Sequence, residues 1–134
     1  MLSTECVNEL RSSWLPNITD KGLDRLIELL EKNSPLLIHG CFTRTVPMGC
    51  LATHAAWHHP DTAHLTSDAG IYWLNRIAGL NPATSLVIRE WDCHGPHNFE
   101  TRAAFLEILK DERTTRRQAA KPQNRLPAFS EIGV

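Results

Sequence analysis

Hydrophobic side chains recur at helical spacing through most of this chain. The clearest case is the segment 19–32, whose apolar residues follow an i, i+3, i+4, i+7 pattern: Leu23, Leu26, Ile27 and Leu30. Thr19 stands where a helix N-cap is expected, and Asn33-Ser34-Pro35 interrupts the pattern. The pattern therefore predicts an amphipathic helix over 19–32 with one face in the core.

Weaker patterns predict five more helices, over 3–13, 49–59, 68–78, 82–92 and from Asn98 to about residue 112. Ile71 is expected in the buried stripe of its helix and Phe99 among the buried residues of the last one, whereas Ser85 is expected on an exposed face. Wherever the connections are short, neighbouring helices are expected to be antiparallel. The predicted fold class is all-α, a compact bundle of five or six short helices.

The segment 36–48 does not fit either period well. Leu36-Leu37-Ile38 suits the start of a helix or a short buried strand, and Phe42 to Val46 alternates as a strand does. We favour helical turns here and keep the strand as the alternative.

Helical periodicity is lost beyond residue 112. Residues 110–134 carry 6 basic and 3 acidic side chains, whereas residues 1–109 carry 8 and 12. The sequence thus predicts a single helical domain over 1–112 and an irregular basic tail over 113–134, extended or partly disordered. Near its end are apolar residues that suit docking on a neighbouring protein: Leu126, Pro127, Ala128, Phe129 and Ile132.

Composition narrows the function classes. The formal net charge is −1 and 42% of the residues are hydrophobic, as in ordinary globular proteins. No stretch reaches the roughly 18 apolar residues of a membrane span, and the first residues lack the pattern of a secretory leader. We therefore expect a cytoplasmic protein with four free cysteines and no membrane partner. Nucleic acid is not expected either, because the basic residues of 113–125 come with no base-reading or stacking element.

The most unusual composition lies at Gly49 to Leu65, which holds four of the seven histidines. In a helix over 49–59, Cys50, His54 and His58 fall at i, i+4 and i+8 on one face. Imidazole and thiolate are the usual ligands of zinc and other transition metals, and His94 is the best candidate for a fourth ligand.

Two other interpretations of this cluster stay open. The metal-binding patterns HExxH and CxxC are absent from the sequence. In the first interpretation His54 and His58 therefore belong to the core, where their rings form hydrogen bonds with backbone carbonyls and Cys50 packs as a small apolar residue. We favour this core interpretation over the metal site. A nucleophilic Cys50 activated by His54 is the third option, and no known local signature surrounds it.

The sequence does not name an activity, and whether the protein is an enzyme stays open. The main hypothesis is a small helical protein that acts through a protein partner or by self-association. The alternative is a protein that binds zinc or iron through the His/Cys cluster of residues 50–64. Such a metal-binding protein could also be an enzyme.

Overall fold

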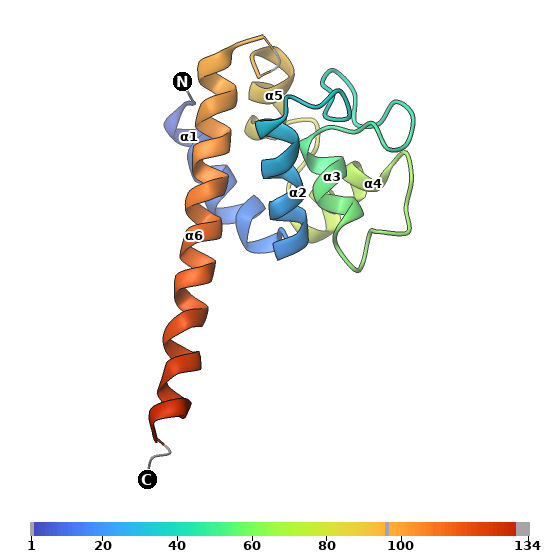
Figure 1. Ribbon diagram of the computed structural model, residues 1–134. Coiled ribbons are helices and arrows are strands. Elements are labelled where there is room, and N and C mark those ends of the chain that lie inside the picture. The colour runs from blue at the N-terminus through green and yellow to red at the C-terminus, as the bar shows by residue number, and fades with distance from the viewer. Residues whose placement is uncertain (1, 96, 131–134) are drawn as a thin grey trace.

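The computed structural model describes the backbone of residues 2–95 and 97–130 and the side chains up to residue 120. In this part of the chain the α-helices are α1 (Thr4–Glu9), α2 (Asp20–Glu31), α3 (Leu51–Trp57), α4 (Ala69–Tyr72), α5 (Leu86–Cys93) and α6 (Phe99–Ser130). One π-helical turn follows α1 at Leu10–Trp14 and another follows α4 at Trp73–Ile77. Over the described ranges there are single bridges and no strand, so the predicted all-α fold class is confirmed (Figure 1).

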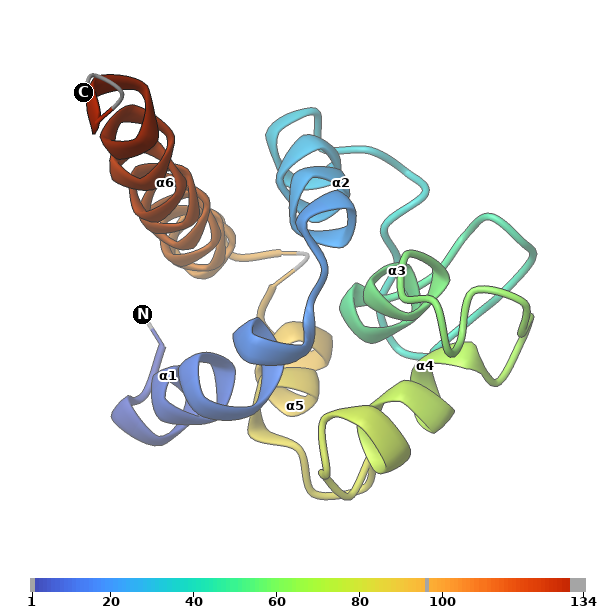
Figure 2. The ribbon, with the colours of Figure 1, turned by 90° about the horizontal axis from the view of Figure 1, so that it is seen from below.

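Helix α3 lies inside the bundle, between α2 and α4 (Figure 2). All of its residues except Trp57 are buried, as its run of small and apolar side chains predicts. The two π-helical turns bring Trp14 and Trp73 together at the core, with ring centroids 5.2 Å apart in an edge-to-face contact. The core therefore surrounds the short helix that carries His54.

Helix α2 forms where the sequence predicts it. The Thr19 hydroxyl accepts a hydrogen bond from the Gly22 amide at 3.0 Å, which makes Thr19 the N-cap. The same hydroxyl donates to the His58 carbonyl at 2.6 Å. One side chain thus caps α2 and ties it to the end of α3.

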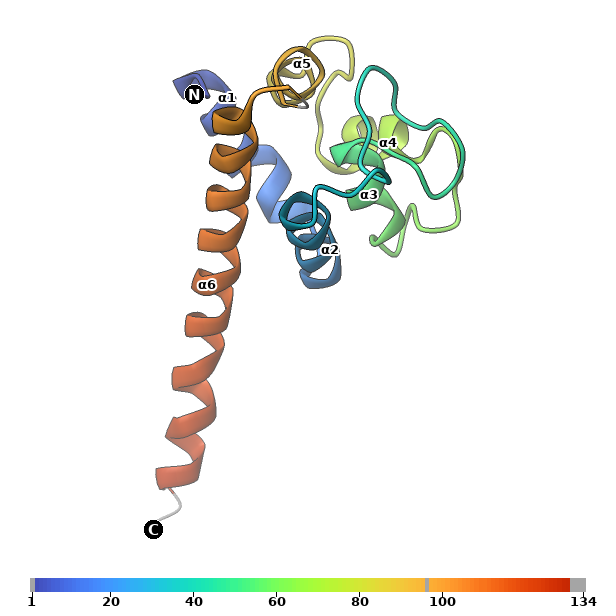
Figure 3. The ribbon, with the colours of Figure 1, turned by 45° about the horizontal axis from the view of Figure 1, so that its top comes forward.

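Helix α6 is longer than the sequence predicts. It continues to Ser130 through a segment for which an irregular tail was expected from residue 113. Ion pairs hold this part against α2: Arg116 lies 2.8 Å from Asp20, and Arg113 lies 3.5 Å from Asp24. Because ion pairs hold this part of α6 against α2, the helix packs here without a periodic row of apolar side chains. Past α2, α6 runs on beyond the rest of the bundle (Figures 1 and 3).

The end of the C-terminal segment lies partly outside the described residues. The side chains that were expected to dock on a neighbour, from Leu126 to Ile132, lie outside the side chains described, and a domain boundary at residue 112 stays a prediction. Among the described helices, none has the length and apolar character needed to cross a membrane.

The segment 36–49 is an irregular loop and neither of the two expected structures. It folds back on itself through backbone pairs: the Ile38 amide donates to the Gly49 carbonyl, and the Gly49 amide to the Leu36 carbonyl, each at 3.0 Å. The Cys50 amide donates to the Phe42 carbonyl at 2.9 Å. This loop covers the start of α3.

The start of α5 also differs from the prediction. Asn81-Pro82 makes a turn, and the helix begins at Leu86 with Ser85 as its N-cap. Ser85, expected on an exposed face, is buried because its hydroxyl donates to the Glu9 carboxylate and accepts from the Ile88 amide. Glu9 also accepts from the Leu86 amide at 2.8 Å and the Val87 amide at 3.2 Å. A residue of α1 therefore caps α5.

Two side chains expected in the core are exposed instead. Ile71 is 42% exposed, because Ala69, Gly70 and Trp73 occupy the inner side of this helical segment and Ile71 lies on the other side. Phe99 is 84% exposed. It lies about 120° around α6 from Phe105, which faces the core, so it cannot share the same buried stripe.

Candidate functional site

The predicted metal ligands of the central helix occupy its two ends and its middle. Cys50 is the N-cap of α3 and His58 its C-cap, so only His54 lies within the helix. Cys50 is buried, with its sulfur 3.7 Å from the Thr53 hydroxyl. Burial raises the pKa of the Cys50 thiol to about 11, which keeps it protonated near neutral pH. In this state the thiol is a poor nucleophile.

Each of the two histidines has its own backbone partner. His54 is 1% exposed, and its Nε2 lies 2.8 Å from the Leu36 carbonyl. The Nδ1 of His58 lies 2.9 Å from the His54 carbonyl. These are the contacts that the core interpretation expects. The contact of His54 attaches the irregular loop to α3, and that of His58 lies at the end of α3 itself.

His94 lies at the C-cap of α5 with an exposed side chain. Its backbone carbonyl accepts from the amides of His97 and Asn98, which forms the turn into α6. Within the described residues, no group of three or more His, Cys, Asp or Glu side chains is arranged to hold a metal ion. Metal binding by Cys50, His54, His58 and His94 thus stays a prediction from spacing, to which the observed contacts add nothing.

The burial of His54 predicts a dependence of stability on pH. Burial lowers the pKa of His54, although its hydrogen bond to Leu36 opposes this shift. Below the ordinary histidine pKa, His54 is protonated in the unfolded chain but stays neutral in the folded one. The free energy of unfolding should therefore fall as the pH drops from 7 to 5.

Urea denaturation at several pH values measures this effect. His54→Gln should reduce the pH dependence, while His64→Gln, a change on an exposed side chain, should leave it nearly intact. Equal pH dependence in the wild type and in His54→Gln would show that His54 is not the group responsible.

A small cavity lies where the irregular loop meets α5. It has a volume of about 110 Å³ and is lined by Cys41, Cys50 and Asp92, together with Gly40, Phe42 and Ile88. The Asp92 carboxylate already accepts a hydrogen bond from the Gly40 amide at 3.0 Å. Asp92 therefore serves to position the loop, and the cavity offers little room for a ligand.

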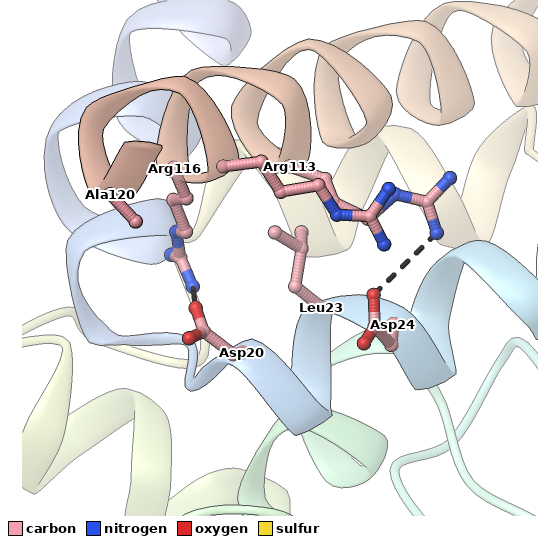
Figure 4. Close-up of a pocket in the computed structure, with 7 residues that line it drawn as sticks. Asp20, Leu23, Asp24, Arg113, Arg116 and Ala120 are labelled. Carbon is pink, nitrogen blue, oxygen red and sulfur yellow. Dashed lines mark hydrogen bonds and ion pairs between the residues drawn. The ribbon is translucent and has the colours of Figure 1, made fainter. Parts of the chain in front are cut away.

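A second cavity, of about 250 Å³, separates α2 from the middle of α6. Figure 4 shows Arg116 reaching Asp20 and Arg113 reaching Asp24, with Leu23 between the two pairs. Arg116 also pairs with Glu112 at 2.7 Å and donates to the Leu15 carbonyl. Two of the arginines that line this cavity pair with aspartates across it, so the cavity is a contact between two helices of the chain.

A groove of about 550 Å³ lies where the end of α2 meets the start of α6. We call it the α2–α6 groove. It is lined by Leu30, Glu31, Asn33, Phe99, Arg102, Ala103 and Leu106. Phe99 is the most exposed large apolar side chain among the described residues. This surface is not apparent in the sequence, because the apolar pattern predicts Phe99 and Leu106 on the same buried face as Phe105.

Arg102 is the one cationic side chain that lines this groove. One of its terminal nitrogens donates to the Leu30 carbonyl at 3.4 Å, near the end of α2. Its Nε atom is buried and has no hydrogen-bond partner in the described part of the chain. The sequence does indicate that this residue lies near Phe99, since Phe99, Arg102 and Leu106 follow i, i+3, i+7 spacing on one side of a helix.

Searches among protein families, characterised proteins and solved structures found no match for this chain, so its function has to be argued from these residues.

Proposed function

We propose that the protein is a binding module for a segment of another polypeptide, and that the α2–α6 groove is its docking surface. The observation that supports this proposal is the 84% exposure of Phe99 at the groove. A phenyl ring in water forgoes the favourable transfer free energy of burial, roughly 2 kcal/mol, and a partner that covers it recovers this free energy.

The position of Phe99 suits an anchor residue. It stands on the first turn of α6, a helix that Phe105, Ile108 and Leu109 fix to the core. A ring on a rigid helix loses little further freedom on binding. Aromatic side chains in this kind of setting often supply much of the affinity of an interface.

The shape of the groove favours a polypeptide over a small ligand. Two packed helices form its walls, and its apolar lining from Leu30, Ala103 and Leu106 continues the surface of Phe99. A helix or extended segment with apolar side chains at regular spacing can lie along such a groove. A second copy of this chain is the other occupant to be tested.

The experiment selects peptides from a random display library on the full-length protein and measures their affinity by fluorescence anisotropy. Phe99→Ser should weaken the selected peptides at least tenfold, which is the effect of removing an interface anchor. It should change the free energy of unfolding by less than about 0.5 kcal/mol, because the ring is exposed. Tyr72→Ser, at another partly exposed aromatic ring, is the matched control and should not change the affinity.

Two results would contradict the proposal. Peptides that bind Phe99→Ser as tightly as the wild type would place the docking surface elsewhere. A dimer that forms with increasing concentration in sedimentation experiments and disappears in Phe99→Ser would assign the groove to a second copy of the chain.

A further inference from the structure

The α2–α6 groove combines apolar walls with a single cation whose charge is not balanced locally. We propose that it selects partner segments that place a carboxylate, from Asp, Glu or a chain terminus, beside a large apolar side chain, and that Arg102 binds the carboxylate. This inference rests on the proposed function, because it names the chemistry of the segment that the groove accepts.

The hydrogen bonding of Arg102 is incomplete. A guanidinium has five N–H donors, and of these the structure gives one contact, a 3.4 Å bond from Nη2 to the Leu30 carbonyl. The Nε donor is buried without a partner among the described residues. Protein atoms cover Nε, so a partner cannot reach this donor. Arg102 as a whole is only partly buried and lines the groove, so its terminal N–H groups are the donors that an incoming acceptor can meet.

Arg102 is the charged side chain of the groove that has no ion-pair partner among the described residues. Glu31, on the α2 side, pairs with Lys110 at 2.7 Å, so these two charges compensate each other. No ion pair of Arg102 occurs among the described side chains. A carboxylate is the acceptor that matches a guanidinium best, because its two oxygens can take two parallel N–H bonds.

The spacing on α6 sets the order of features in the partner. Phe99, Arg102 and Leu106 lie at i, i+3 and i+7, so a cation stands between two apolar side chains on one side of the helix. A complementary segment carries its carboxylate next to at least one large apolar residue. Phosphate groups fit less well, since one guanidinium between apolar walls offers too little charge for a dianion.

The experiment uses a panel of eight-residue peptides in which one Asp or Glu lies among Leu, Ile and Phe residues. Each peptide has a matched partner with Asn or Gln in place of the acid, and a third version with phosphoserine. Anisotropy with the full-length wild type should give at least tenfold tighter binding of the acidic peptides than of their amide partners, and the preference should shrink as salt increases.

The variants separate ligand binding from a structural role for Arg102. Arg102→Gln should bind acidic and amide peptides about equally, and Arg102→Lys should keep part of the preference because it keeps the charge. Arg89→Gln, on the exposed side of α5, is the matched control and should retain the full preference. If Arg102→Gln fails to fold, the Lys variant and the paired peptides still test the proposal.

Each contrary outcome has a distinct meaning. Equal binding of acidic and amide peptides to the wild type, with binding still lost in Phe99→Ser, would overturn the acid preference and leave the proposed function intact. An unchanged preference in a folded Arg102→Gln variant would show that Arg102 only stabilises the end of α2. Tightest binding of the phosphoserine peptides would assign the groove to phosphorylated segments, and binding that ignores Phe99 would overturn the proposed function itself.

Discussion

Replacing Glu9 by alanine is expected to lower the free energy of unfolding by about 2–4 kcal/mol, because the Glu9 carboxylate caps a helix far away in the sequence. It accepts hydrogen bonds from the Leu86 and Val87 amides and from the Ser85 hydroxyl. It also accepts from the Trp14 indole nitrogen at 3.1 Å. Alanine would leave these donors unpaired and remove a negative charge from the N-terminal end of α5.

Guanidinium denaturation followed by circular dichroism measures this loss. Glu9→Gln should cost less than Glu9→Ala, because the amide keeps one acceptor oxygen, and Glu5→Ala should change stability by less than about 0.5 kcal/mol since Glu5 is exposed. If Glu9→Ala were as stable as Glu5→Ala, the contact between α1 and α5 would have no energetic weight.

Helix α2 could be predicted from the sequence because its signals are local. The four apolar positions and the cap at Thr19 lie within one segment, and the Glu28–Lys32 pair, 2.9 Å apart, lies within a single turn. The start of α5 could not be predicted in the same way. Asn81-Pro82 looks like a helix start, whereas the actual start at Leu86 depends on Glu9, which is more than 70 residues away.

The length of α6 was missed for a related reason. Residues 113–120 have no apolar stripe, so the periodicity that reveals a helix is absent. Arg113 and Arg116 pair instead with acids of α2 one turn apart, and the sequence does not show that these segments meet. Pairing between distant charged residues cannot be inferred from hydrophobic periodicity.

The metal site predicted from the sequence and the α2–α6 groove lie in different parts of the molecule, and the metal site stays a prediction. The His/Cys-rich centre drew attention because of its composition, yet His54 and His58 are engaged with backbone carbonyls. The groove at Phe99 and Arg102 consists of common residue types, and only the orientation of α6 shows that one is exposed and the other incompletely paired. Composition identifies unusual segments, but a docking surface depends on which side of each helix the fold covers.

Replacing Gly70 by alanine is expected to cost about 3 kcal/mol, because this glycine lets α4 approach the backbone of α3. A Cβ at position 70 would lie 2.9 Å from the Thr53 amide nitrogen and closer still to the Thr53 hydroxyl. Both are fully buried parts of α3, so the clash cannot be relieved by rotating a flexible side chain into solvent.

The effect of Gly70→Ala should extend beyond the two helices. The Thr53 hydroxyl donates to the Phe42 carbonyl at 2.7 Å, and the same carbonyl accepts from the Cys50 amide. A displaced Thr53 should therefore loosen the irregular loop, which hydrogen exchange would detect as faster exchange of the Cys50 amide.

Gly22→Ala is the matched control for this prediction. Its nearest contact is 3.3 Å, to the Thr19 hydroxyl, and alanine favours helices over glycine by roughly 1 kcal/mol, so the two effects nearly cancel. A Gly70→Ala variant as stable as Gly22→Ala, with unchanged exchange at Cys50, would show that α4 can move away from α3 freely. The close packing of these helices would then not be what holds the loop in place over the central helix.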